Sequence, residues 1–141
     1  MSDIEIRKVE KNDFQNIQKF VDKWLSGRAI KEGGGNDYFV TKNQHKSYFK
    51  NYHVYIALDK DKIIGWLVKE KSNVLIHLLI DPYYRGKGIG KQMMTIANPD
   101  IIRSKSDQQT GDPKLFYERL GYKIVIDSKV GKKKNIDMMS K

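Results

Sequence analysis

The chain has 141 residues, enough for one domain with a hydrophobic core and too few for two. Hydrophobic residues make up 39% and charged residues 31%, which excludes a disordered chain, and no apolar run approaches the ~20 residues of a membrane span. There is no cysteine, so disulfides, thiolate nucleophiles and zinc–thiolate sites are excluded and we expect a cytoplasmic protein.

The net charge is +10, from 27 Lys and Arg against 17 Asp and Glu. Nucleic acid, an anionic membrane face and an anionic small molecule such as a phosphorylated cofactor are all compatible with it. The lysines are spread along the chain, and only residues 132–134 form a run. This distribution favours a solvated, lysine-rich surface over a dedicated partner.

The first half of the chain alternates between strand and helix patterns. Apolar residues at spacings of two indicate strands, and those at spacings of three and four indicate amphipathic helices. In chain order we expect a strand at residues 4–6, a helix at 14–25 capped by Asn12 or Asp13 and closed by Gly27, a glycine loop at 33–35, a helix at 41–50, and a hairpin of strands 53–58 and 63–68.

The second half begins with an almost unbroken apolar run, typical of a strand that is covered on both faces. Glycine and proline then separate the elements. We expect a strand at residues 74–80, a glycine turn at 85–90, a helix at 91–98, a strand at 101–106, a helix introduced by Asp112 and Pro113 and closed by Gly121, and strands at 122–127 and 135–139.

Hairpin-linked strands occur beside crossover connections, so the sheet must be mixed. The sequence predicts a single α/β domain over residues 1–141, with a central sheet of about seven strands flanked by about four helices.

The segment DPYYRGKGIGK at residues 81–91 lies between an apolar strand and an amphipathic helix. Its glycines allow several backbone N–H groups to point into one concavity, and the start of the helix adds partial positive charge. This pattern predicts a pyrophosphate cradle. It is not a P-loop, because only three residues separate Gly86 from Gly90 and Gln92 replaces the hydroxyl; nor is it a dinucleotide fingerprint, because Lys91 occupies the third glycine position.

Residues 85–90 match the pattern [QR]-x-x-G-x-[GA], and LFYERLGY follows at residues 115–122. Together they resemble the Gcn5-related N-acetyltransferases (GNAT), and the element order fits that family from Asp3 to the end. The resemblance implies that acetyl-CoA is the co-substrate and that a primary amine attacks it directly, with no covalent enzyme intermediate. It also implies a GNAT-like fold in which strand 74–80 splays away from strand 101–106.

The resemblance further assigns the cofactor contacts. Backbone groups of Leu78, Leu79 and Ile80 would bind the pantetheine arm in the gap between the two strands. The pyrophosphate would be held by Arg85, Gly86, Lys87, Gly88, Ile89, Gly90 and Lys91.

Tyr117 lies where relatives place the acid that protonates the departing thiolate. Its phenol can donate to the CoA sulfur; the alternative is core packing, because Phe116 and Leu120 share its helix. Tyr117 is the catalytic candidate of the sequence.

The general base is unassigned. The strand positions that carry it in relatives are Val74 and Ile76, and neither side chain accepts a proton. Strict alternation places His77 on the opposite face, unless a bulge rotates it back. Lys105 and Thr110 stand at the positions of two further family residues. Water, or Glu32 in the glycine loop, stays open as the acceptor of the proton that the amine releases.

The acceptor amine is also open. It should enter between residues 29–39, where Tyr38 and Phe39 are candidate walls, and the last turn. An RNA-linked amine such as aminoacyl-tRNA is one alternative to a small molecule, peptide or protein. A catalytically weak acyl-CoA-binding module and a nucleic-acid-binding domain are two more, although the second leaves the glycine turn unexplained. We expect no metal site, because the three histidines are widely separated; the resemblance permits a homodimer.

Overall fold

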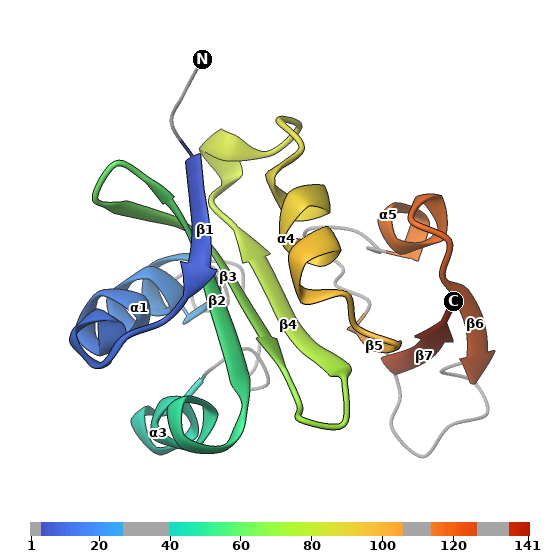
Figure 1. Cartoon of the computed structure of the whole chain (residues 1–141), viewed down its shortest axis with the longest axis horizontal. Helices are drawn as coiled ribbons and strands as arrows, with labels where there is room; N and C mark the ends of the chain where they lie inside the picture. Colours follow the sequence, from blue (N-terminus) through green and yellow to red (C-terminus); the bar gives the residue numbers. More distant parts are fainter. Residues whose placement is uncertain (1–3, 27–39, 106–113, 127–135) are drawn as a thin grey trace.

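The computed structural model describes residues 4–26, 40–105, 114–126 and 136–141. In this part of the chain, seven strands form one sheet in the order β1-β2-β3-β4-β5-β7-β6 (Figure 1). Only β4 and β5 are parallel; the other neighbours are antiparallel, which confirms the predicted mixed sheet. The strands are β1 Ile4–Lys8, β2 His53–Asp59, β3 Lys62–Lys69, β4 Val74–Ile80, β5 Ile101–Lys105, β6 Lys123–Ile126 and β7 Ile136–Ser140.

Helices cover both faces of the sheet, as the predicted α/β class requires. α1 and α3 lie on one face, and α4 and α5 lie on the other (Figure 1). Their bounds are α1 Phe14–Val21, α3 Lys42–Asn51, α4 Ile89–Ala97 and α5 Lys114–Arg119. The number and order of these helices confirm the predicted architecture.

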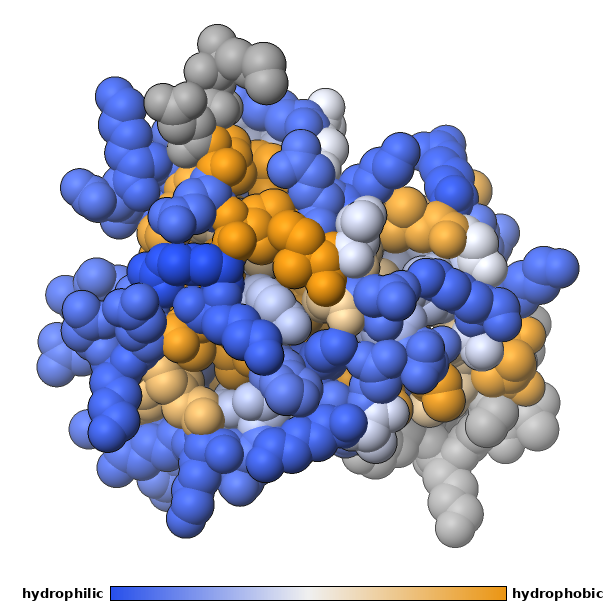
Figure 2. Space-filling view, viewed as in Figure 1, coloured by the Kyte–Doolittle hydropathy of each residue, from blue (hydrophilic) through white to orange (hydrophobic). Residues whose placement is uncertain are grey.

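Each face of the sheet has its own hydrophobic core. The residues of β2 alternate between them: Val54 and Ile56 face α1 and α3, whereas Tyr55 and Ala57 face α4. This double coverage explains why the central strands read as apolar runs. Figure 2 shows hydrophilic residues over much of the face seen in Figure 1, with hydrophobic residues reaching the surface at its centre and on its right.

The start of α1 differs from the prediction. Asp13 does not cap the helix with its side chain. Instead its carboxylate accepts the Glu10 N–H at 2.7 Å and pairs with the Arg7 guanidinium at 2.8 Å, around the 3-10 turn Lys11–Asp13. The bond to Arg7, a residue of β1, lowers the pKa of Asp13. A contact with a neighbouring strand therefore replaces the local cap.

The end of α1 also differs, because the α-helix stops at Val21 and continues as a π-helical turn, η2, over Asp22–Ser26. The predicted closing residue, Gly27, lies outside the described residues. The start of α3 agrees with the prediction, and its N-cap residue Thr41 forms a capping box with Gln44. No helix in the described ranges has both the length and the apolar character that crossing a bilayer requires.

Candidate active site

A buried aspartate starts the glycine turn at the end of β4. Asp81 is 2% exposed, and its carboxylate accepts the Tyr83 N–H at 2.9 Å, which caps the 3-10 turn η4 Pro82–Tyr84. The backbone N–H of Asp81 donates to the carbonyl of Ile64 on β3 at 2.8 Å. The turn therefore leaves the sheet from a fixed position.

Tyr84 attaches the same turn to the β2–β3 hairpin. Its hydroxyl donates to the Asp59 carboxylate at 2.6 Å, and this hydrogen bond raises the pKa of the phenol. The Nζ atoms of Lys62 and Lys87 lie 5.5 and 5.1 Å from the centre of its ring, within cation–π range. The ammonium group of Lys87, one of the predicted phosphate ligands, thus lies over the ring of Tyr84.

Two glycines give the turn its shape. Gly86 and Gly88 have φ angles of 77° and 80°, in the left-handed region that disfavours other residues. A Cβ atom at either position would meet no atom within 4 Å, so the space beside them is open. Both glycines thus present bare backbone to this space, as the predicted cradle requires.

Helix α4 begins earlier than the predicted start at residue 91. Gly88 is its N-cap, so Ile89, Gly90 and Lys91 belong to the first helical turn. The N–H groups of a first turn have no acceptor within their helix and carry partial positive charge. Most of the predicted cradle is therefore the N-terminus of α4 itself, which favours anion binding.

Strands β4 and β5 diverge beyond their first residues. They pair only at Val74 with Ile101 and at Leu75 with Ile102 among the described residues. On its other side β4 stays paired with β3 as far as Ile80. The β5 side of the β4 backbone at residues 78–80 therefore has no strand partner, and the splay inferred from the family resemblance is confirmed.

A polar network holds the two strands together at the closed end of this gap. Lys69 Nζ donates to the Asn73 side chain at 2.7 Å and to the carbonyl of Ala97, the last residue of α4. The Asn73 carbonyl accepts the Asp100 N–H at 2.9 Å. The β3–β4 turn is thus bonded to the link between α4 and β5, which determines where the gap begins.

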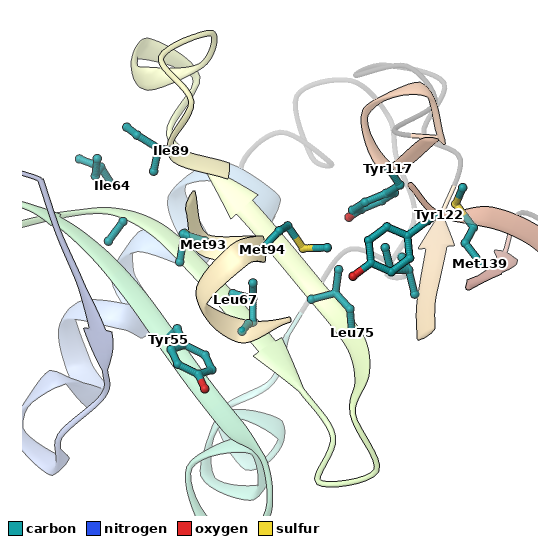
Figure 3. Packing of buried hydrophobic residues seen from close by; sticks show 13 residues of the cluster. Tyr55, Ile64, Leu67, Leu75, Ile89, Met93, Met94, Tyr117, Tyr122 and Met139 are labelled. Carbon is teal, nitrogen blue, oxygen red and sulfur yellow. The ribbon is translucent and has the colours of Figure 1, made fainter. Parts of the chain in front are cut away.

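Tyr117 lies deep in the core on the α4 side of the gap. It is 7% exposed and packs against Phe116 and Tyr122, with ring centres 5.3 and 6.5 Å away. Figure 3 shows its hydroxyl pointing from α5 toward Met94 on α4. Burial, and to a lesser extent Tyr122, raises the pKa of Tyr117 well above its usual range. The phenol therefore stays protonated throughout the neutral range.

Strict alternation fails on β4, and this corrects the expected position of His77. Val68 pairs with His77 but Lys69 pairs with Leu75, so Ile76 is the extra residue of a β-bulge. Ile76 packs against the core on the α1 and α3 side, and the ring of His77 stacks on Trp66 of that core, 4.9 Å between centres. His77 therefore shares the face of Ile76 rather than lying opposite it.

Tyr48 of α3 lies beside His77 on this face. Its hydroxyl is 3.0 Å from His77 Nε2, and the two rings are 5.5 Å apart. Burial and then Tyr52 raise the pKa of Tyr48, whereas the nearby positive charge of Arg103 on β5 opposes the rise. Nothing local in the sequence connects Tyr48, His77 and Arg103, and sequence analysis missed this cluster.

Several predicted residues lie outside the described ranges: Glu32, the glycines at 33–35, Tyr38, Phe39, Thr110, Asp112, Pro113 and the lysines at 132–134. In the part of the chain that the structure describes, no three His, Asp or Glu side chains come close enough to hold a metal ion.

A family model described as the acetyltransferase (GNAT) domain matches residues 50–124. This range is more than half of the chain and contains the bulge, the splayed strand, the glycine turn and Tyr117. Curated protein sequences give no match.

Solved structures share the fold over nearly the whole chain. The PaiA N-acetyltransferase of Thermoplasma acidophilum, in complex with coenzyme A, is 21% identical with a TM-score of 0.71, covering 100% of this chain and 99% of that one. An aminoglycoside 6'-N-acetyltransferase complexed with coenzyme A is 16% identical with a TM-score of 0.66, over 97% and 96%. The ribosomal-protein-S18-alanine N-acetyltransferase of Escherichia coli is 11% identical with a TM-score of 0.64, over 96% and 90%. With its glycine turn, splayed strands and family match, the chain belongs to the GNAT acetyltransferase family and is an acyltransferase.

Proposed function

We propose that this protein transfers an acetyl group from acetyl-CoA to the nitrogen of a primary amine. The observation that carries the proposal is the open β4 edge at residues 78–80, which leads directly to the glycine turn and the N-terminus of α4. Unpartnered strand N–H and C=O groups seek hydrogen bonds, and the amides of a pantetheine arm can supply them as an added strand would. The helix N-terminus suits the pyrophosphate at the other end of the same ligand.

The cofactor contacts follow from this arrangement. Backbone groups of Leu78, Leu79 and Ile80 bind the pantetheine amides. The pyrophosphate is bound by N–H groups of the turn and the first turn of α4, with charge from nearby side chains; the contributing residues are Arg85, Gly86, Lys87, Gly88, Ile89, Gly90 and Lys91. The thioester then lies toward the closed end of the gap, near the bulge.

The reaction forms one C–N bond and breaks one C–S bond. The amine nitrogen attacks the acetyl carbonyl, and the thiolate departs as Tyr117 donates its phenolic proton to the sulfur. Burial works against a lasting tyrosinate, so the donation must accompany C–S cleavage rather than precede it.

The proton released by the amine passes to the pair formed by Tyr48 and His77. As the Tyr48 oxygen accepts that proton, its own proton moves to His77 Nε2, 3.0 Å away. His77 then releases a proton to solvent and Tyr117 regains one, which restores the resting state. The base in this route is the Tyr48–His77 pair. It therefore does not depend on Val74 and Ile76, the apolar residues at the positions that carry the base in relatives.

Measurements of acetyl-CoA binding and CoA release distinguish the proposed function from two others. A weak acyl-CoA-binding module would bind acetyl-CoA without releasing CoA when amines are added. An enzyme for RNA-linked amines would accept aminoacylated RNA and reject small amines, with an activity that falls steeply with salt. A thiol reagent that detects CoA release across a panel of amines and RNAs distinguishes all three.

The cofactor site is tested by Gly88→Val, with Gly121→Val as the matched control. Both glycines have positive φ, 80° and 98°, and open space around a built Cβ atom, so both variants carry similar backbone strain. Only the side chain at 88 enters the cradle. We expect the Kd for acetyl-CoA, measured by calorimetry, to rise about tenfold or more for Gly88→Val and to change little for Gly121→Val. Equal affinities in the two variants would remove the assignment.

A further inference from the structure

The structure limits the side from which an amine can reach the thioester, and this inference rests on the proposed function. On the α4 side, the closed end of the gap is filled by the buried side chains of Leu75, Met94, Tyr117 and Tyr122 (Figure 3). On the α3 side it is bordered by the polar groups of Tyr48 and His77. The acceptor therefore approaches past α3.

Arg103 lies on that same side. Its neighbour Ile102 is fully buried in the core beneath α4, so alternation along β5 directs Arg103 to the opposite face, toward α3. On this face its charge opposes the rise in the pKa of Tyr48 that burial and Tyr52 cause. Arg103 is half-buried.

No carboxylate neutralises this guanidinium within the described residues, where the ion pairs are Arg7–Asp13 and Lys62–Asp81. A partly desolvated arginine without an anionic partner is unfavourable, and such side chains are usually paired. The anionic group of a ligand would be a suitable partner at this position.

The elements around the cluster have a single sign of charge. α3, β4 and β5 contain no aspartate or glutamate, whereas they contain Lys42, Lys46, Lys50 and Arg103. Such a surface attracts anions and repels polycations. A polyamine, an aminoglycoside or a basic peptide is therefore a poor match as the acceptor.

We propose that the acceptor is a small amine that carries a carboxylate within a few bonds of its nitrogen, as an amino acid does, and that Arg103 binds this carboxylate. A guanidinium binds a carboxylate with two parallel hydrogen bonds, which orients the ligand as well as holding it. Tyr48 is within hydrogen-bond distance of His77, and the charge of Arg103 acts on the same phenol. An acceptor anchored on Arg103 would therefore present its amine to the Tyr48–His77 pair. Arg103 is the specificity-determining residue of this arrangement.

The test compares amines that differ only in the carboxylate. Glycine, β-alanine and L-glutamate are paired with glycinamide, β-alaninamide and L-glutamate diamide, with spermidine and an aminoacylated RNA as further acceptors. Binding is measured as the shift in melting temperature of the CoA-saturated protein, and turnover as CoA release. We expect at least one carboxylated amine to stabilise the protein and to react, and its amide to do neither at the same concentration.

Arg103→Gln should raise the KM of the accepted carboxylated amine about tenfold or more, with kcat changed much less, and Arg103→Lys should recover part of the loss. Lys123→Gln, which removes one positive charge from the exposed edge strand β6, should have no effect. The affinity for acetyl-CoA should be the same in all three variants.

Three outcomes would overturn the inference while the acetyl transfer stands. The first is that amides or spermidine react as well as amino acids, and the second is that aminoacylated RNA is the sole acceptor. The third is that Arg103→Gln affects an acid and its amide equally. If no carboxylated amine shifts the melting temperature, the inference is likewise wrong. If the wild-type protein fails to bind acetyl-CoA, the proposed function and this inference fail together.

Discussion

Two tyrosines of the core beneath α4 illustrate how one residue type serves two purposes. Tyr122 is 2% exposed, and its hydroxyl donates to the carbonyl of Pro99, so its polar group is used in holding the fold. Tyr117, 7% exposed, lies beside it in a helix that borders the closed end of the gap. Burial raises the pKa of both phenols, and more strongly for Tyr117. The role proposed for Tyr117 therefore rests on its position beside the gap and not on a greater acidity.

Tyr117→Phe keeps the ring and removes the proton donor, so we expect kcat to fall by ~10²–10⁴-fold while the KM for acetyl-CoA stays nearly unchanged. The control is Tyr122→Phe, which leaves the Pro99 carbonyl unsatisfied and should lower the free energy of unfolding by ~1–3 kcal/mol with little effect on kcat. Single-turnover kinetics and denaturant titration measure the two effects. A Tyr117→Phe enzyme that reacts within about a factor of two of wild type would return Tyr117 to a packing role and make water the proton source.

At the scale of elements, the bulge on β4 matters most for the site. One extra residue, Ile76, turns His77 onto the face where α3 supplies Tyr48. Beyond Leu75 the same strand stays paired with β3 but not with β5. It therefore supplies an open backbone edge at residues 78–80 and, next to that edge, the polar side chain of His77. The polar network of Lys69 and Asn73 determines that the gap between β4 and β5 begins near the bulge.

Removing either member of the Tyr48–His77 pair should interrupt the same proton route. We expect His77→Gln and Tyr48→Phe each to lower kcat by ~10²-fold or more, and the double variant to be little worse than the more damaged single variant. Affinity for acetyl-CoA, measured by calorimetry, should not change. His53→Gln, at a half-buried histidine at the start of β2, is the control and should react normally. Effects that multiply in the double variant would show that the two residues act separately.

At the scale of the whole molecule, the core between the sheet and helices α1 and α3 contains a buried histidine. His45 on α3 is 1% exposed, and its Nε2 atom has no hydrogen-bond partner among the residues that the structure describes. It is surrounded by aromatic rings, including Phe14 and Trp66 with centres 6.2 and 5.7 Å away. Burial lowers the pKa of His45, and the charge of Asp22 only partly opposes this. The folded protein therefore holds this imidazole neutral.

This histidine makes the stability of the fold depend on pH. The unfolded chain binds a proton at His45 below its ordinary pKa of 6.5, whereas the folded protein resists doing so. The contribution to stability is therefore complete above pH 6.5 and is lost as the pH falls below it, by up to ~1.4 kcal/mol for each pH unit over which only the unfolded chain is protonated.

Denaturant titrations between pH 7.5 and 5 should show this decline in wild type and a shallower one in His45→Leu. The half-buried His53, whose pKa is also lowered by burial and then by nearby lysines, provides the comparison, and His53→Leu should remove less of the slope. Identical slopes in wild type and His45→Leu would show that His45 does not titrate differently on folding.

The elements that the sequence determined by itself are those with local causes. An apolar run bounded by turns produces β4 at its predicted bounds, Val74–Ile80, and two glycines with positive φ shape the turn that follows it. The family motif at residues 85–90 depends on the same local chemistry. For that reason the sheet, the four helices and the glycine turn could all be predicted from one chain.

The tertiary structure decided what depends on partners distant in the sequence. Arg7 of β1, rather than a helical N–H, takes the carboxylate of Asp13. The register with β3 creates the bulge that turns His77, and only the fold brings Tyr48 of α3 within hydrogen-bond distance of His77 and within the influence of the charge of Arg103. Periodicity describes an element in isolation, and it carries no information on where a neighbouring strand forces an extra residue or which side chains meet across a sheet. The proposed cofactor cradle can therefore be predicted from the sequence, whereas the proposed acceptor side depends on contacts that only the tertiary structure makes.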